Sequence, residues 1–442
     1  MFCAFFITYL IIFALMFMSI ILFENNSKKI IFWGLIISLT SIFGYFIYFV
    51  FYCDKGYVKK YLYIKAKEDE IYRNLAEFKV ENKPAECELM NFANRVYNVN
   101  FYKNTHLEII KNNDEFNNNI LEDIDKSEHF IIIDTRCFLN SINKDLIINS
   151  LIEKQKYGVA VKVIYSKKTM KDNSIIKQFK LNNIRCCKFN NSIDRNRFYR
   201  NNKNMISIDG KVAYLFSDND KFSNKKIEVE YFNLYYKLTG DVIKAIDLEA
   251  HLDVSFATKK YYPLIEYPKN SIQDNVEYQY IASSIDNSLL DLILKAIIQA
   301  KKSIIIHVDK FIPNESILEA IRLAIKSDIS VKIMISNVNY QYGYYTTRSY
   351  VKELAREGVV CYFYDGHINT NYVLVDDNLV MTGTISFINQ NLICDLQDVL
   401  IINDEKLSKE FNEMFNDSVK NSYKLCNPKR ILFREKFFRK FM

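Results

Sequence analysis

Two stretches of this chain repeat one pattern of short apolar segments, and this repeat limits the fold more than any other feature. In the first copy, residues 130–138 precede a stretch of helical length, and residues 158–166 follow it. In the second copy, residues 303–311 precede the helical pattern of residues 315–326, and residues 328–336 follow it. Short β-branched runs separated by amphipathic segments are typical of βαβ units. We therefore expect an α/β fold whose sheets are mainly parallel.

The repeat continues further along the chain. Residues 202–209 correspond to residues 369–376, and each stretch contains Asn-x-Asn, an apolar strand and then Asp. The soluble part is therefore expected to consist of two homologous βαβ halves, residues 106–262 and 263–425, which form one pseudo-two-fold globule. A site is expected in the crevice between the halves, where ligand sites commonly lie.

The N-terminal end is strongly apolar. Residues 2–23 and residues 30–53 contain no charged side chain, and each run exceeds the roughly 20 residues that a membrane-spanning helix needs. We expect residues 1–53 to form two transmembrane helices. The larger basic cluster follows the second run, so the soluble part is expected on the cytoplasmic side of a multi-pass membrane protein. That cluster comprises Lys55, Lys59, Lys60, Lys65 and Lys67.

Two further segments flank the halves. Residues 54–105 are helical and mixed in charge, and we expect a juxtamembrane connector there. Residues 426–442 form a basic amphipathic tail, which fits either an interfacial segment on an anionic leaflet or a terminal helix docked on the core. The net charge is +7, but the basic residues follow no nucleic-acid-reading motif. The nine cysteines lack a Cys-x-x-Cys pair, so we expect reduced thiols, with neither a metal nor a cofactor.

Several short motifs together resemble the bacterial cardiolipin synthases of the phospholipase D superfamily. They extend over nearly the whole chain, from the second apolar run to the segment before the second Asn-x-Asn. The resemblance implies two phospholipase-D-like halves around one site for phosphatidyl transfer. The matching segments are residues 32–34, 44–46, 211–214, 238–241, 300–306, 311–313 and 348–359.

The same resemblance implies a catalytic pattern, His-x-Lys-x4-Asp, once in each half. One His attacks phosphorus, the other acts as acid and base, and the Lys pair holds the phosphate oxygens. In this chain the two Asp positions are present, but all four His and Lys positions are Asn. Asn233 also stands where an Asp is expected, and residues 383–386 depart from the pattern Gly-Ser-x-Asn. The corresponding positions are Asn202, Asn204, Asp209, Asn369, Asn371 and Asp376.

An amide is neither a phosphoryl-accepting nucleophile nor a titrating group near neutral pH. With two ammonium groups missing and Asp209 and Asp376 retained, the pocket is expected to be neutral or acidic, which disfavours a phosphodiester. Lys203 would point to the opposite face of its strand and is a poor substitute. His367 could lean into the site but lacks a matching Lys, and His307 fits a structural role. No catalytic residue is therefore expected to be intact.

Three hypotheses for function follow. The first is a membrane-anchored cardiolipin-synthase-like protein without catalysis, which serves as partner, regulator or scaffold in anionic phospholipid synthesis or binds a lipid surface. Its expected partners are membrane lipids, in particular anionic phospholipids, and an active cardiolipin synthase. The alternative is an active phosphatidyltransferase that makes cardiolipin from phosphatidylglycerol through non-standard residues. The third is a decaying paralogue without a selected function.

Overall fold

The structure is a computed structural model, and it divides into two compact units that are described separately. The first unit contains the N-terminal helices, and the second contains both halves of the repeat. The stretch of residues 52–84, which holds most of the expected connector, lies outside the described residues. The structure describes residues 2–23, 27–40, 42–51, 85–135, 144–165, 173–189, 200–217, 231–258, 271–283, 288–338, 343–389, 392, 395–426 and 431–441.

The N-terminal unit contains three helices, α1 (Phe2–Phe23), α2 (Ser27–Thr40) and α3 (Ile42–Phe51). The second apolar run is therefore divided between α2 and α3 rather than forming one helix. A small buried cluster joins the three helices, in which Trp33 packs edge-on against Tyr48 with ring centroids 5.4 Å apart. Among the described residues, no helix combines the length and the apolar character required to cross a membrane. The expectation of two transmembrane helices is thus not supported by the structure.

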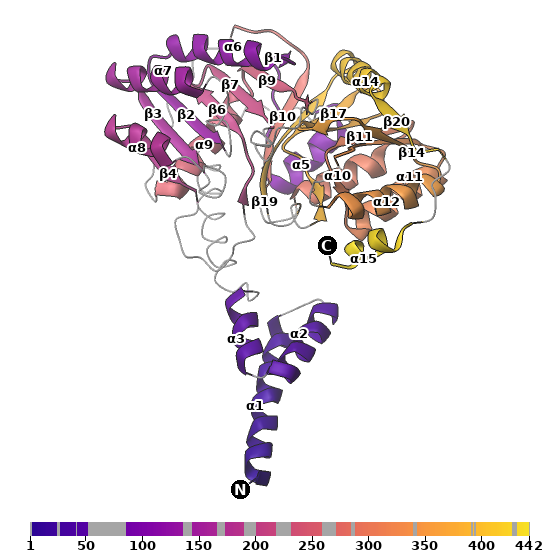
Figure 1. The fold of residues 1–442 in the computed structure, drawn as a ribbon. Helices are drawn as coiled ribbons and strands as arrows, with labels where there is room; N and C mark the ends of the chain where they lie inside the picture. Colours follow the sequence, from indigo (N-terminus) through magenta and orange to yellow (C-terminus); the bar gives the residue numbers. More distant parts are fainter. Residues whose placement is uncertain are drawn as a thin grey trace. The chain divides into compact units, whose positions relative to one another are not determined.

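The first half of the repeat forms a seven-stranded sheet with helices on both faces (Figure 1). Its strand order is β1-β9-β7-β6-β2-β3-β4. Helices α6 (Asn113–Asp125), α7 (Lys144–Lys156) and α8 (Asn173–Leu181) contribute to the core on one face, and α9 (Ile243–Thr258) covers the other. The strands are β1 (Thr105–Ile110), β2 (Phe130–Thr135), β3 (Ala160–Tyr165), β4 (Arg185–Lys188), β6 (Met205–Ile208), β7 (Val212–Phe216) and β9 (Tyr235–Gly240).

The second half repeats this topology, in the order β10-β19-β17-β16-β11-β13-β14, with β20 (Ser422–Lys424) added at the edge. The predicted internal repeat is therefore confirmed strand by strand. The predicted helix over 315–326 is also confirmed as α11 (Glu315–Lys326), which begins where the Asn314 side chain accepts a hydrogen bond from the Ile317 N–H. The strands are β10 (Glu277–Ser283), β11 (Ser303–Val308), β13 (Ser330–Ser336), β14 (Val360–Tyr364), β16 (Asn371–Val375), β17 (Leu379–Gly383) and β19 (Asp395–Asn403).

The expectation of mainly parallel sheets is wrong. In the first sheet only β2–β3 and β3–β4 pair in parallel, whereas β1–β9, β9–β7, β7–β6 and β6–β2 are antiparallel. For the β6–β7 pair the physical reason is the tight turn at Asp209 and Gly210, whose φ angles are 53° and 61°. Such a short connection can join only antiparallel neighbours, because a parallel pair needs a long crossover.

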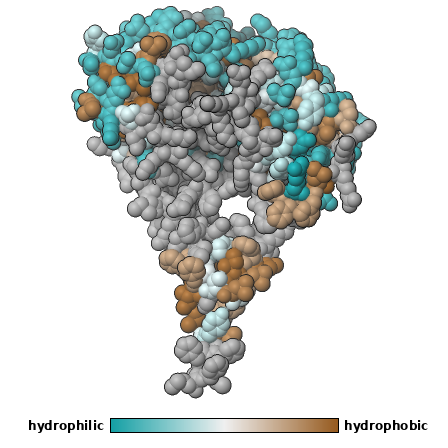
Figure 2. Space-filling model, in the orientation of Figure 1, coloured by the Kyte–Doolittle hydropathy of each residue, from teal (hydrophilic) through white to brown (hydrophobic). Residues whose placement is uncertain are grey.

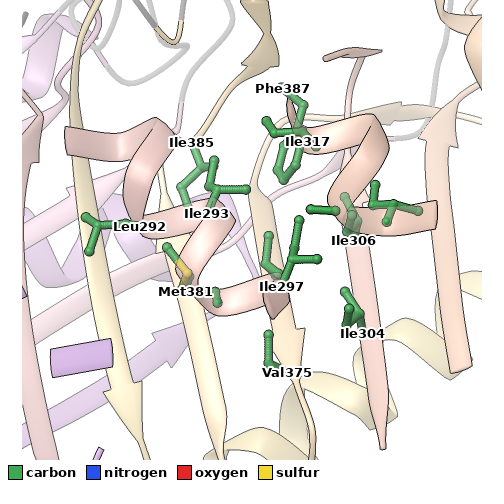
Figure 3. Packing of buried hydrophobic residues seen from close by; sticks show 14 of the residues in the cluster. Leu292, Ile293, Ile297, Ile304, Ile306, Ile317, Val375, Met381, Ile385 and Phe387 are labelled. Atoms are coloured by element: carbon green, nitrogen blue, oxygen red, sulfur yellow. The ribbon is translucent and has the colours of Figure 1, made fainter. Parts of the chain in front are cut away.

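Two hydrophobic cores stabilise the second half. On its outer face, α5 (Glu88–Tyr97), α10 (Ser288–Gln299), α11 and α12 (Tyr344–Arg356) pack on the sheet. Figure 3 shows Ile293 and Ile297 of α10 in the same cluster as Met381 and Val375 of the sheet. Helix α5, which lies within the segment expected to be a connector, thus belongs to this core. On the inner face, one buried cluster includes α9, α14 (Glu405–Lys420) and residues from both sheets. The two halves therefore share a core.

Candidate functional site

The first Asn-x-Asn segment lies between β5 (Arg200–Asn201) and β6 and is held by the opposite half. Strand β5 pairs in parallel with β19, and the Asn202 N–H donates to the Leu396 carbonyl at 2.8 Å. The Asn202 side-chain amide donates to Asp395 Oδ2 at 2.6 Å. Asn202 is therefore fixed by a carboxylate of the second half.

The second Asn-x-Asn segment makes the reciprocal contact. Strand β15 (His367–Ile368) pairs in parallel with β8 (Tyr231–Phe232) of the first half. The Asn369 amide donates to Asn233 Oδ1 at 2.6 Å, and Asn369 Oδ1 is buried without a hydrogen-bond partner among the described atoms. The halves thus face each other, and the first Asn of each segment is bonded by a side chain of the opposite half. The partner of Asn202 is a carboxylate, Asp395, whereas the partner of Asn369 is an amide, Asn233.

The second Asn of each segment is also occupied in hydrogen bonds. Asn204 Oδ1 accepts from the Thr135 hydroxyl at 3.3 Å, and the Asn204 N–H donates to Asp398 Oδ2 at 3.2 Å. Asn371 donates to the Ile385 carbonyl at 2.5 Å and accepts from the Asp309 N–H at 2.9 Å. Lysine has no acceptor atom, so these oxygen contacts suit an amide and not an ammonium group.

The two aspartates of the repeat have a structural role. Asp209 accepts hydrogen bonds from the N–H groups of Glu128, His129 and Phe130, at 2.7–2.9 Å. Asp376 accepts from the N–H groups of residues 301–303 in the same way, at 2.7–3.1 Å. Both lie beyond the ends of β6 and β16 that are away from the Asn-x-Asn segments. The expectation of a neutral or acidic pocket therefore cannot rest on these two carboxylates, which are occupied by backbone N–H groups.

Replacing Asp209 with Asn is expected to destabilise the fold without changing the Asn-x-Asn segments. A charge-assisted hydrogen bond contributes about 1.5–3 kcal/mol, and Asn keeps a neutral acceptor, so we expect a loss of about 2 kcal/mol. Urea denaturation measures the change in the free energy of unfolding. Asp377→Asn is the control, because Asp377 is exposed and pairs with Lys302; a change at Asp209 no larger than at Asp377 would contradict the structural role.

Two aspartates that the sequence analysis did not single out lie beside the segments instead. Asp395 and Asp398 come from β19 and are 4% and 1% exposed. Burial raises the pKa of Asp398 to about 6, although hydrogen bonds from Thr384 and from the Asn204 backbone oppose this effect. In the sequence, only the repeat could have indicated Asp395 and Asp398. Their strand β19 corresponds to β9 of the first half, and Asn233 lies just before β9.

His367 forms a second polar cluster close to Asn371. Its Nδ1 lies 3.3 Å from Asp309 Oδ1, and Lys310 Nζ lies 2.7 Å from Asp309 Oδ2. Lys310 and the imidazole outweigh burial and hold the pKa of Asp309 well below its usual range. The structure therefore brings an imidazole and a cation together, but both face a carboxylate, and the imidazole is 2% exposed.

Lys203 points away from the two asparagines, as predicted, into a buried cluster of acids. Its Nζ lies 2.6 Å from Glu249 Oε1 and also contacts Asp253. Asn201 donates to both oxygens of Asp134 at 3.0 and 2.7 Å. Burial disfavours the charged form of Lys203, but the surrounding carboxylates outweigh burial and raise its pKa. Burial raises the pKa of Asp253 well above its ordinary value, although the neighbouring Lys203 opposes this effect.

His307 has no access to the site. It is fully buried and stacks on Tyr372 with ring centroids 4.5 Å apart. Burial lowers its pKa to about 3, so the imidazole is neutral. This agrees with the structural role that the sequence predicts.

Comparison with known proteins agrees with this geometry. A family profile described as "Cardiolipin synthase, PLD-like domain" matches residues 293–419. A cardiolipin synthase from Clostridium perfringens strain SM101 is 26% identical over 420 residues, which cover 88% of this chain and 87% of that protein. The major cardiolipin synthase of Bacillus subtilis strain 168 is 26% identical over 343 residues, which cover 72% and 70%.

A solved structure supports the fold. The phosphatidylserine synthase of Haemophilus influenzae Rd KW20 superposes with a TM-score of 0.61 at 13% identity, over 80% of this chain and 97% of that one. At this identity the match shows the fold alone. The chain is thus similar to bacterial cardiolipin synthases over most of its length, its residues 293–419 match a PLD-like domain, and its fold resembles that of the solved phosphatidylserine synthase.

Proposed function

We propose that this chain is a cardiolipin-synthase-like protein that has lost phosphatidyl transfer and serves anionic phospholipid synthesis as a partner, regulator or scaffold. The observation that carries the proposal is the state of the four asparagines. Asn202 and Asn369 donate across the halves to Asp395 and Asn233. The Asn204 side chain accepts a hydrogen bond from the Thr135 hydroxyl, and the Asn371 side chain donates to the Ile385 carbonyl. The proposed loss of activity follows, because neither half offers a nucleophile or a proton donor at these positions.

The expected loss in the rate of phosphatidyl transfer is large. Acid–base assistance alone contributes about a hundred- to ten-thousand-fold to the rate. Here the nucleophile is replaced as well, so a covalent phosphoryl intermediate cannot form at these positions. The carboxylates of Asp395 and Asp398 stand beside the asparagines and would repel a phosphodiester. We therefore expect no turnover above background.

We also propose that the N-terminal helices attach the protein to a lipid membrane, with the second unit on the cytoplasmic side. Figure 2 shows hydrophobic atoms over this region, and large apolar side chains there face outward. Leu15, Leu39 and Phe43 are 66%, 84% and 67% exposed. Apolar surface of this extent is unusual for a protein region in water and suits contact with lipid.

The native chain is expected to make no cardiolipin. The test is lipid mass spectrometry of a cardiolipin-free bacterial host that expresses it, with the Clostridium perfringens relative expressed in parallel as the positive control. The partner role is tested by co-purification with an active cardiolipin synthase from the native host. Cardiolipin in cells that carry the native chain would overturn the proposed loss of activity.

A second candidate function is phosphatidyl transfer through other residues, and the cluster of His367, Asp309 and Lys310 is the observation that favours it. An imidazole held by a carboxylate is a common acid–base arrangement. If the native chain produces cardiolipin, His367→Ala must abolish the product under this alternative, whereas His106→Ala, at an exposed position of β1, must not. An unchanged product level in His367→Ala would exclude this cluster as the catalytic group.

A further inference from the structure

The C-terminal helix α15 (Phe433–Phe441) is docked on α12 through charged contacts. Lys352 Nζ lies 2.6 Å from Glu435 Oε1, and their side chains are 8% and 2% exposed. Arg439 pairs with Glu353, and Phe438 stacks on Tyr345 with ring centroids 5.7 Å apart. Of the two arrangements that the sequence leaves open, the structure therefore has the tail docked on the protein.

The outer surface of this segment nevertheless remains apolar. Phe433 is 84% exposed, and Leu432, Phe437 and Phe438 are 45–49% exposed. Phe433 and Phe437 lie one helical turn apart, with ring centroids separated by 6.2 Å. Single exposed apolar side chains are common on protein surfaces, but a group of neighbouring exposed aromatic side chains indicates an interaction site. We call Leu432, Phe433, Phe437 and Phe438 the aromatic ridge.

The charges around the aromatic ridge have one sign. Arg434 and Lys436 are exposed, whereas Glu435, the only acid among residues 431–439, is turned inward onto Lys352. The nearest acid on α12, Glu353, is shared by Arg439 and Arg322. The docking contacts thus neutralise the acids of this region. Lys436 stays exposed beside the rings, and Arg434, also exposed, lies over the Tyr345 ring at 4.7 Å from its centroid.

We propose that the aromatic ridge inserts into the interface of a membrane that contains anionic phospholipids, with Arg434 and Lys436 at the headgroups. Exposed rings combined with cations are the arrangement that interfacial helices use, and a basic residue near an anionic surface strengthens binding by about fivefold. A protein partner would instead have to cover the rings with apolar side chains and to place acidic side chains opposite Arg434 and Lys436. This surface does not depend on whether the Asn-x-Asn segments are catalytic.

The test uses the full chain in lipid nanodiscs. Phe433→Trp adds a fluorophore to a chain whose one other tryptophan is Trp33, so the signal is the difference from the unsubstituted protein. Brominated lipids quench a tryptophan that enters the interface. We expect several-fold stronger quenching in discs of phosphatidylcholine mixed with phosphatidylglycerol than in phosphatidylcholine alone. The control is Leu181→Trp, at an 84% exposed position of α8, which should show no lipid-dependent quenching.

A charge variant completes the test. Lys436→Gln should weaken the response to phosphatidylglycerol by about fivefold, whereas Lys409→Gln, an equal charge change on α14, should not. Quenching at residue 433 equal to that at residue 181, or equal in neutral and anionic discs, would overturn the proposal. A blue shift that needs no lipid and grows with protein concentration would assign the ridge to a second copy of the chain and would also overturn it.

Discussion

Five substitutions are expected to give the chain measurable phosphatidyltransferase activity. They are Asn202→His, Asn204→Lys, Asn369→His, Asn371→Lys and Asn233→Asp. A His at 202 would meet the existing Asp395 carboxylate, since the amide of Asn202 already lies 2.6 Å from it. A His at 369 would meet only the Asn233 amide, so Asn233→Asp is needed to supply the second carboxylate.

The carboxylate at 233 gives this prediction its magnitude. Losing the carboxylate that orients a catalytic imidazole costs as much as about ten-thousand-fold in rate. We therefore expect the variant with all five substitutions to exceed the variant without Asn233→Asp by a hundredfold or more. Cardiolipin formed from phosphatidylglycerol vesicles, quantified by mass spectrometry, measures both rates.

A matched control changes Asn202, Asn204, Asn369 and Asn371 to Gln, leaves Asn233 unchanged, and should form no product. Asn204 is only 3% exposed, so a lysine introduced there could prevent folding. The circular dichroism spectrum and thermal midpoint of each variant therefore show whether it folds. A folded five-substitution variant without product would contradict the prediction that these five positions suffice for phosphatidyl transfer.

Replacing Lys203 with Met is expected to cause the largest loss of stability of any single substitution considered. The ammonium group is 1% exposed and lies between Glu249 and Asp253, with Asp134 nearby. Removing one member of a buried ion pair leaves the other charge uncompensated and costs about 3–5 kcal/mol. Chemical denaturation at neutral pH measures this loss. Lys211→Met is the control, because Lys211 pairs with Glu128 at an exposed site, where such pairs contribute about 0–1 kcal/mol.

The loss caused by Lys203→Met should shrink as the pH falls. Burial raises the pKa values of Asp134 and Asp253 above their unfolded values, and without Lys203 these pKa values rise further. The folded variant then binds protons more tightly than the unfolded variant, so its free energy of unfolding increases as the pH falls from neutral through the folded-state pKa values. A loss that stays constant between neutral and mildly acidic pH would contradict the buried cluster.

The sequence predicted the fold well where the information was local and repeated. The β-branched runs at residues 130–138 and 303–311 became β2 and β11, and the stripe of apolar residues at helical spacing became α11. Strand direction was missed, because the antiparallel pairing of β6 with β7 depends on the left-handed conformation of Asp209 and not on hydrophobic periodicity.

The site was predicted less completely. The positions of the four asparagines followed from the repeat and the family pattern, but the partners of their side chains come from segments far away in the chain. Asn202 and Asp395 are separated by 193 residues, and no local pattern links them. The buried partners of Lys203 could have been suspected, since Glu249 and Asp253 lie one turn apart on α9.

The crossed pairing of β5 with β19 and of β8 with β15 means that neither half could exist alone without exposing unpaired backbone where the other half now binds. A half-length ancestor would have needed a second copy of itself, and in a symmetric dimer every mutation appears twice. Tandem fusion removes that constraint. Here one side has kept its acid at Asp395 while the other carries Asn233, a divergence that identical subunits could never achieve.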